Sequence, residues 1–400
     1  PKLIIMRWRR FMRRSSAVIR PWLWGLAWPS GPSCRDRGGR AGEAADAAAG
    51  SRWWVTGSIP ETLPVPPRAI RYRVAMRTFP VSATSFGREP ARLSDLLARG
   101  PVVLDGAMGT ELDARGVDTR NSLWSTRALT TAPDVVREVH SDYLDAGARV
   151  ITTNTYQATL PALIRSGEDA AGAREVIAAG ASLAKEAARR FAEAHPEEPV
   201  LVAGGLGPYG AYLADGSEYT GAYGIDLPED PGFQKVHLPR IEALVGEGVD
   251  LFALETLPRL DEAQALVAMV KGLAPQAECW VSFQARPDGT RLADGTPLAE
   301  AAAWAAQEEI VVAVGINCVA PGVVGRALPV LRAATGKPLV AYPNAGDLYD
   351  PATKTWQSTG EGAGIAALAP SWIDAGVRLV GGCCRTRPAQ ISELARAVRP

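Results

Sequence analysis

The chain has 400 residues, 47% of them hydrophobic, and its 43 basic residues equal its 43 acidic residues in number. This length is sufficient for one large barrel or two smaller domains, and no run of about 18 apolar residues predicts a membrane span. Residues 1–75 carry ten more basic than acidic residues, and the remainder carries ten more acidic than basic residues. The acidic body argues against a general nucleic-acid-binding protein, which needs a basic face.

Residues 1–92 differ from the rest of the chain. They contain six of the eleven tryptophans and show no sustained helical or strand period. Such a segment is typical of an Arg-rich targeting peptide, of a basic tail for membranes or nucleic acid, or of upstream sequence joined to a reading frame that starts at Met76. We favour the third interpretation, because six tryptophans in an aperiodic segment suit neither of the others. In each case we expect a disordered extension.

From about residue 93 onwards, short apolar runs alternate with helical stretches. Short continuous apolar runs are typical of parallel strands that are buried on both faces. Eight such runs occur, at 102–105, 150–153, 200–203, 251–254, 280–283, 311–314, 339–342 and 379–382.

The helical stretches between these runs have recognisable ends. Pro133 is predicted to open one helix that ends near Gly147, and Pro239 to open another that Gly248 closes. Alanine-rich residues 172–194 and residues 388–398 form two more. Eight strands with interleaved helices predict a (β/α)8 TIM barrel over residues 93–400. The absence of a GxGxxG motif after the first strand argues against a dinucleotide-binding doubly wound sheet.

Three cysteines follow predicted barrel strands, where the active sites of such barrels lie. Cys318 follows the sixth strand, and Cys383 and Cys384 follow the eighth. Three converging thiolates need a cation, and zinc suits sulfur ligands. Three protein ligands leave a fourth position open for a substrate thiol. An ordinary buried thiol is the competing interpretation, and we adopt it for Cys34 and Cys279.

The cysteine pattern also bears on the compartment. The chain has five cysteines, an odd number, and two of them are adjacent, so a secreted disulfide framework is a poor interpretation. Free thiols favour a reducing compartment, and we expect a cytoplasmic protein.

Other polar groups at the strand ends indicate a binding site for a small cationic molecule. Asp105 follows the first strand and Glu255 ends the fourth, and two carboxylates at one pocket suit a substrate ammonium group. An N-cap or turn role is the alternative for Asp105. Several tyrosines offer π-faces to a sulfonium cation or simply pack loops: Tyr156, Tyr209, Tyr212, Tyr219, Tyr223 and Tyr342.

The three histidines are expected to lie on helices, away from the strand ends. None of them is predicted to bind metal, and only His237 remains a candidate for contacting the site residues. The three are His140, His195 and His237.

Several motifs together resemble those of the homocysteine S-methyltransferase family, in the family's order. The resemblance covers residues 96–399 and is closest to the branch that uses S-methylmethionine or S-adenosylmethionine. The motifs are LDGAMGTEL at 104–112, TNTYQAT at 153–159, ALETLP at 253–258, GINCVAP at 315–321, YPNAGDLYDPATKTW at 342–356 and GGCCRT at 381–386.

The resemblance implies roles for individual residues. Cys318, Cys383 and Cys384 would bind Zn²⁺, and Asp105 and Glu255 would hold the amino group of homocysteine. Three further residues would line the pocket: Thr153, Asn317 and Asn344. The implied reaction moves a methyl group from a sulfonium donor to homocysteine and makes methionine, with small molecules as the only partners and without nucleic acid or membrane.

Two alternatives remain open. A betaine- or folate-dependent homocysteine methyltransferase would use the same barrel. A zinc- or redox-sensing protein without catalytic activity would have a closed fourth metal position.

Overall fold

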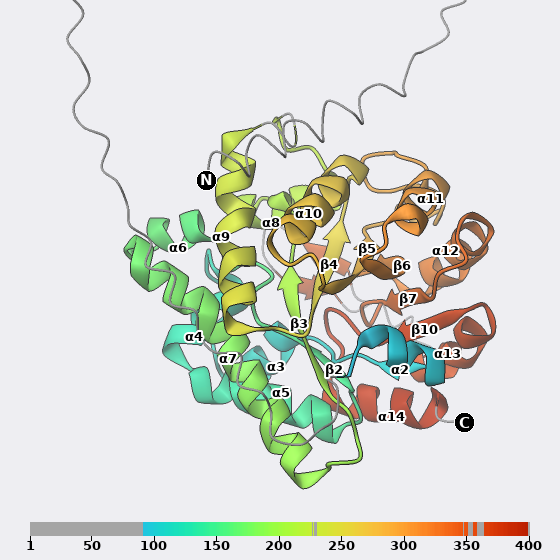
Figure 1. Ribbon diagram of the computed structural model, residues 1–400, viewed down its shortest axis with the longest axis horizontal. Helices are drawn as coiled ribbons and strands as arrows, with labels where there is room; N and C mark the ends of the chain where they lie inside the picture. Colours follow the sequence, from blue (N-terminus) through green and yellow to red (C-terminus); the bar gives the residue numbers. More distant parts are fainter. Residues whose placement is uncertain are drawn as a thin grey trace, which may run out of the picture. The chain divides into compact units, whose positions relative to one another are not determined.

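The computed structural model describes residues 91–225, 227, 230–346, 348–350, 355–357 and 364–398. The extension predicted over residues 1–92 lies outside these residues except for its last two, as does part of the motif at 342–356. Eight strands stand side by side with helices around them, and the predicted TIM barrel is confirmed (Figure 1). Among the described residues, no helix is long and apolar enough to cross a membrane.

Each of the eight predicted apolar runs forms a barrel strand. The strands are β1 (Val102–Val103), β2 (Val150–Thr152), β3 (Leu201–Leu206), β4 (Leu251–Leu257), β5 (Glu278–Phe283), β6 (Val311–Asn317), β7 (Leu339–Tyr342) and β10 (Val377–Val380). Two further strands, β8 (Leu348–Asp350) and β9 (Thr355–Gln357), pair antiparallel as a separate hairpin between β7 and β10.

The barrel closes where its first strand meets both the second and the last. The sheet runs in the order β1-β10-β7-β6-β5-β4-β3-β2, with parallel pairing throughout. A parallel bridge from Leu104 to Val150 joins the two ends of this order. The Asp105 amide donates to the Val150 carbonyl at 3.1 Å across the same seam. Closure brings the carboxyl ends of all eight strands to one rim.

Helices and two short 3-10 turns fill the connections. They are α2 (Leu93–Arg99), α3 (Met108–Ala114), η1 (Trp124–Arg127), α4 (Ala128–Thr131), α5 (Pro133–Asp145), α6 (Leu160–Arg165), α7 (Ala170–Ala194), α8 (Tyr209–Leu213), η2 (Ser217–Tyr219), α9 (Pro231–Glu247), α10 (Leu260–Leu273), α11 (Leu298–Gln307), α12 (Pro321–Ala334), α13 (Ile365–Asp374) and α14 (Pro388–Val398).

The predicted start of one helix was wrong. Helix α9 begins at Pro231, with the Asp230 side chain accepting from the Gly232 amide, and Pro239 lies inside the helix. An N-cap aspartate followed by proline is itself a strong start signal, so the helix begins eight residues earlier than Pro239 indicates. Gly248 does end this helix, in a left-handed conformation (φ 66°).

The core has an inner and an outer part. The outer part lies between strands and helices, and the inner part fills the barrel with side chains such as Ala253, Trp280 and Leu379. Three leucines of α2 join the inner cluster. The α2 segment is held to Glu278, the first residue of β5, by the hydroxyl of Ser94 (2.5 Å) and the guanidinium of Arg92 (3.1 Å). Helix α2 therefore covers the amino-terminal end of the barrel and leaves the opposite rim for a site.

Candidate metal centre and substrate site

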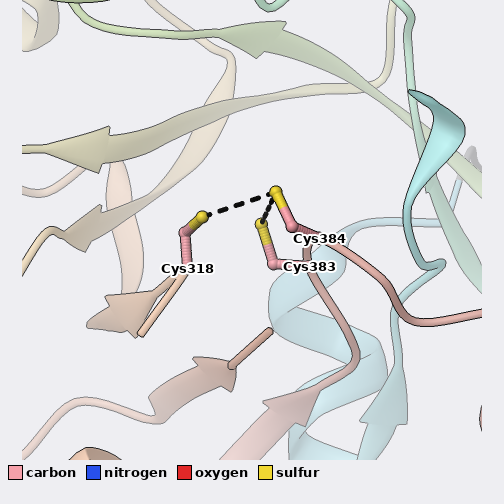
Figure 2. A group of neighbouring side chains, drawn as sticks. All are labelled: Cys318, Cys383 and Cys384. Atoms are coloured by element: carbon pink, nitrogen blue, oxygen red, sulfur yellow. Dashed lines mark hydrogen bonds between the residues drawn. The ribbon is translucent and has the colours of Figure 1, made fainter. Parts of the chain in front are cut away.

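Three cysteine side chains converge at the carboxyl-terminal rim of the barrel. Cys318 directly follows β6, and Cys383 and Cys384 lie in the loop between β10 and α14. The Sγ atom of Cys384 lies 3.7 Å from that of Cys318 and 4.0 Å from that of Cys383 (Figure 2). All three sulfurs lie within 4.8 Å of one another. The cysteines are far apart in the chain but meet here because β6 and β10 lie on either side of β7 in the sheet.

The backbone around these cysteines is tightly constrained. Cys318 adopts a left-handed conformation (φ 52°), which is unfavourable for a residue with a side chain and turns its sulfur towards the other two. A Cβ atom on Gly381 would lie 2.5 Å from the Leu104 Cβ, and one on Gly382 would lie 2.3 Å from the Thr386 hydroxyl. The two glycines therefore allow the cysteine loop to approach strand β1 and its own next turn.

Neighbouring strand ends hold the cysteine loop in place. The Cys383 amide donates to the Pro343 carbonyl at 2.7 Å, and the Cys318 amide donates to the Tyr342 carbonyl at 3.1 Å. The Gly382 amide donates to the Asp105 carbonyl at 3.2 Å. Backbone bonds from β1, β6 and β7 thus fix the relative positions of the three sulfurs.

The electrostatics of the three thiols favour a bound cation. The hydrogen bond to Cys318, together with burial, raises the pKa of Cys383 well above its ordinary value. The pKa values of Cys318 and Cys384 are also raised well above the ordinary value. Thiols this close can ionise together only beside a positive charge. Three sulfurs in this arrangement can hold a soft divalent metal ion.

Two carboxylates lie beside the cysteines. Asp105, which is buried, accepts from the Thr152 amide at 2.7 Å. Burial, reinforced by the charge of Glu255, raises the pKa of Asp105 to about 8. Burial likewise raises the pKa of Glu255 to about 7. A buried and a half-buried carboxyl group so close together suit a ligand that brings a positive charge, such as an ammonium group.

A buried polar network connects the carboxylate to the metal-site strand. The Tyr342 hydroxyl donates to Glu255 Oε2 at 3.2 Å and lies 2.5 Å from the Ser282 hydroxyl. Ser282 in turn donates to the Asn317 carboxamide oxygen at 2.8 Å. The Trp280 indole donates to the Tyr342 hydroxyl at 3.0 Å, from inside the barrel. Asn317, predicted to line the pocket, is fully buried, and its side-chain nitrogen also donates to Cys383 Sγ at 4.0 Å.

The two other predicted pocket residues also make bonds within the protein. The Thr153 hydroxyl accepts from the Gly205 amide at 2.9 Å and lies 2.6 Å from the Thr155 hydroxyl. The carboxamide oxygen of Asn344 accepts from the Gly346 amide at 3.0 Å. Both side chains are buried at the rim and stabilise its turns.

Tyr156 is half-buried, and the other five tyrosines fall into two groups. The rings of Tyr212 and Tyr223 both pack against that of Tyr209, with centroids 5.3 and 5.6 Å from it, so the loop-packing interpretation holds for these three. Tyr219 reaches the cysteine cluster, where its hydroxyl lies 4.0 Å from Cys318 Sγ. Tyr342 adjoins Glu255, as described above.

The histidines lie on or at the end of helices, as predicted. His140 is in α5, His237 is in α9, and His195 caps the end of α7. His237 Nδ1 lies 2.8 Å from the Arg240 guanidinium. Arg240 donates to the carbonyl of Tyr156 at 2.6 Å. His237 thus contacts Arg240, which sequence reasoning did not single out, and its Nε2 lies 3.6 Å from Glu262.

Comparison with known proteins agrees with this geometry. A family model described as "Homocysteine S-methyltransferase" matches residues 102–398, which include the barrel strands and all three cysteines. The chain belongs to the homocysteine S-methyltransferase family.

Individual members of the family match over most of their length. The chain is 46% identical over 295 residues to homocysteine S-methyltransferase of Escherichia coli, covering 73% of this chain and 94% of the relative. It is 42% identical over 302 residues to homocysteine S-methyltransferase YbgG of Bacillus subtilis, covering 74% and 94%. The crystal structure of the metallated form of the homocysteine methyltransferase MmuM from Escherichia coli superposes with a TM-score of 0.68 at 43% identity, covering 76% of this chain and 98% of that one.

Two residues that support the site, Tyr143 and Thr386, were not identified from the sequence. The hydroxyl of Tyr143 in α5 donates to the carbonyl of Thr386 at 3.0 Å. The Thr386 hydroxyl donates to the carbonyl of Cys383 at 2.5 Å. Tyr143 occupies a core position on a helix, where periodicity predicts packing and gives no signal of a polar contact to the cysteine loop.

Proposed function

We propose that this protein transfers a methyl group from S-methylmethionine or S-adenosylmethionine to the thiol of homocysteine, forming methionine. The observation that carries the proposal is the position of three sulfurs within 4.8 Å of one another beside the carboxylates of Asp105 and Glu255. A metal-binding thiol cluster suits the sulfur of homocysteine, and the carboxylates suit its ammonium group. Membership of the homocysteine S-methyltransferase family supports the same reaction.

We further propose that Cys318, Cys383 and Cys384 hold zinc. The donor set fits, because three thiols with raised pKa values need a soft cation to ionise. The metallated form of MmuM supports a metal in this family. Three protein ligands would leave room for the thiol of homocysteine to bind the same ion. Zinc there would lower the pKa of a substrate thiol, so that homocysteine is a thiolate near neutral pH.

The residues of the chain mainly position the two substrates. Asp105 and Glu255 would bind the homocysteine ammonium group, and Tyr342 orients Glu255 through its hydrogen bond. Asn317, Thr153 and Asn344 would shape the pocket by fixing the strand ends. Holding the thiolate in line with the methyl group converts a bimolecular encounter into a reaction within one complex.

The chemical step needs no acid or base from the protein. The homocysteine thiolate attacks the methyl carbon and forms the new sulfur–carbon bond of methionine. The bond from that carbon to the donor sulfonium breaks, and its electron pair remains on the donor sulfur. The donor therefore leaves as a neutral thioether, and the thiol proton has already passed to solvent.

We also propose the wider organisation of the protein. Residues 93–400 form the catalytic barrel domain, and residues 1–92 are an extension that the reaction does not need. The four free cysteines among the described residues support a reducing, cytoplasmic compartment. The acidic balance of residues 76–400 supports small molecules rather than nucleic acid as partners.

The test is methionine formation from homocysteine by the full chain, with S-methylmethionine, S-adenosylmethionine and betaine as separate donors. Metal content is measured in parallel for the wild type and for Cys383→Ala. Cys279→Ala is the matched control, because Cys279 is buried outside the cluster. We expect turnover with a sulfonium donor, loss of both zinc and turnover in Cys383→Ala, and neither loss in Cys279→Ala.

Other outcomes would identify the rival functions. Turnover with betaine but with neither sulfonium compound would show that betaine is the methyl donor. A folded, zinc-loaded protein that forms no methionine with any donor would contradict the reaction and favour a sensing role.

A further inference from the structure

Glu218 is a buried carboxylate without an assigned role. It lies in the 3-10 turn η2, and only 2% of its surface is exposed. Its Oε2 atom has no hydrogen-bond partner within the described part of the chain, and the same holds for the hydroxyl of the adjacent Ser217. An ionised carboxylate is costly to bury unless a positive charge or hydrogen bonds compensate for the lost water. A cationic ligand would compensate for this cost.

The surroundings of Glu218 belong to the metal site. The next residue, Tyr219, places its hydroxyl 4.0 Å from Cys318 Sγ. Burial, followed by the charge of Glu218, raises the pKa of Tyr156 well above its ordinary value, so the carboxylate lies near that phenol as well. Gly210 allows this arrangement, because a Cβ atom there would lie 2.3 Å from the Glu218 amide nitrogen. Glu218 and two aromatic rings thus lie together beside the sulfur cluster.

This group is distinct from the proposed homocysteine carboxylates. The charge of Glu255 adds to the raised pKa values of Asp105 and Cys383. Glu218 instead directly precedes Tyr219, whose hydroxyl lies 4.0 Å from Cys318 Sγ, and Tyr156 lies near both Glu218 and Glu255. Glu255 therefore adjoins Cys383, and Glu218 is a second acidic group next to the tyrosine that contacts Cys318. A reaction between an ammonium-bearing thiol and a cationic donor needs two such groups.

We propose that Glu218, with the rings of Tyr156 and Tyr219, forms the subsite for the sulfonium group of the methyl donor. The inference rests on the proposed function and deepens it by naming the residues on the donor side. Aromatic faces attract a sulfonium cation, and the carboxylate compensates its charge without forming a bond to it. The donor sulfur loses its positive charge when the methyl group leaves, so the subsite would bind the neutral thioether product more weakly.

The experiment compares two ligands that differ at one sulfur. S-methylmethionine and methionine share the ammonium and carboxylate groups, and only the former carries a sulfonium. Calorimetric titration of each ligand into the full-length, metal-loaded protein without homocysteine measures binding alone. The variant is Glu218→Gln, which keeps the shape and removes the charge. Glu175→Gln is the control, because Glu175 is exposed on α7.

We expect Glu218→Gln to weaken S-methylmethionine binding at least about tenfold, while methionine binding changes by less than about twofold. Glu175→Gln should leave both unchanged. In turnover, the donor KM should rise while the homocysteine KM and the metal content stay the same. If Glu218→Gln does not fold, Glu218→Asp is the test variant. Its shorter side chain withdraws the carboxylate, which should weaken the binding of S-methylmethionine but not that of methionine.

An equal loss of affinity for S-methylmethionine and methionine would overturn the inference, because Glu218 would then bind the ammonium group that both ligands share. Unchanged binding of S-methylmethionine, or no binding of it to the wild type, would also overturn it. Selective binding of the sulfonium ligand without methionine formation would leave this subsite standing and contradict the proposed reaction instead.

Discussion

The side-chain amide of Asn317 donates to the hydroxyl of Thr256 at 2.7 Å, and its oxygen accepts from the Thr256 backbone amide at 2.8 Å. This pair joins the ends of β6 and β4. Asn317 directly precedes Cys318, and Thr256 directly follows Glu255. Both Thr256 (φ 60°) and Cys318 (φ 52°) adopt left-handed conformations next to these bonds. One amide thus sets the geometry of a cysteine of the cluster and of a proposed substrate carboxylate.

Replacing Asn317 should therefore impair both parts of the site. Asn317→Ala leaves the buried Thr256 amide without its acceptor, and we expect about 1–3 kcal/mol of lost stability. Metal affinity should fall about 10- to 100-fold, as is typical when a partner of a ligand is removed. Urea unfolding and a competitive chelator titration measure the two effects. Ser282→Ala removes only one bond to Asn317 and should have smaller effects; equal effects would contradict the proposed role of the amide.

Asp105 should matter only for substrates that carry an amino group. We expect Asp105→Asn to raise the homocysteine KM about 10- to 100-fold, because a buried charge pair is lost. The matched substrate is 4-mercaptobutanoate, which has the same thiol and carboxylate but lacks the amine. Steady-state kinetics with both thiols test the assignment, and an equal rise in both KM values would refute it.

The close approach of Gly382 predicts a steric effect on the metal site. In Gly382→Ala the new Cβ would lie 2.3 Å from the Thr386 hydroxyl and 2.5 Å from its Cβ, so the cysteine loop must shift. Metal affinity should fall at least about tenfold. The control is Gly246→Ala in α9, where no heavy atom beyond the chain neighbours and the local helix backbone lies within 4 Å of the added carbon. A Gly382→Ala protein with wild-type metal affinity would show that the loop tolerates the displacement.

His140 should make the protein less stable in mild acid. It is fully buried, and neither ring nitrogen has a partner among the described residues. Burial lowers the pKa of His140 to about 4, below its ordinary value of 6.5. Between these values the unfolded chain binds a proton that the folded protein excludes, so stability falls as the pH falls.

The size of this effect is measurable with one variant. Between pH 7.5 and 5.5, the wild type should lose about 1.4 kcal/mol more unfolding free energy than His140→Leu. Urea unfolding of both proteins at the two pH values gives the difference. Identical pH dependence would mean that His140 titrates normally in the folded state.

Periodicity and strand order predicted the barrel and the convergence of the cysteines. Eight apolar runs of strand length define the sheet, and a closed parallel sheet brings the residues after β6 and β10 to one rim. The same reasoning misplaced the start of α9, because Pro239 is acceptable both as a first residue and inside a longer helix. The start is determined by Asp230 and Pro231.

The hydrogen-bond partners of individual side chains could not be predicted from the sequence. Thr153 and Asn344 follow strands in the expected manner, but their bonds are to the backbone of the rim, as a polar residue at a strand end also permits. Glu218 and Arg240 lie in stretches with no motif that marks a buried charge. Arg240 donates to the carbonyls of Tyr156 and Gly207, which lie in loops distant in sequence, and only the folded chain brings them together.

The closed barrel and the sulfur cluster both depend on the part of the chain that is synthesised last. Strand β1 is made first but has to pair with β10, and Cys318 is made 66 positions before Cys384. A growing chain on the ribosome therefore has neither a closed barrel nor a complete metal site until β10 and the cysteines after it have emerged. The metal site can therefore form only after these residues have been synthesised. A product truncated before Cys383 would contain most of the barrel sequence but would lack two of the three cysteines and the proposed activity.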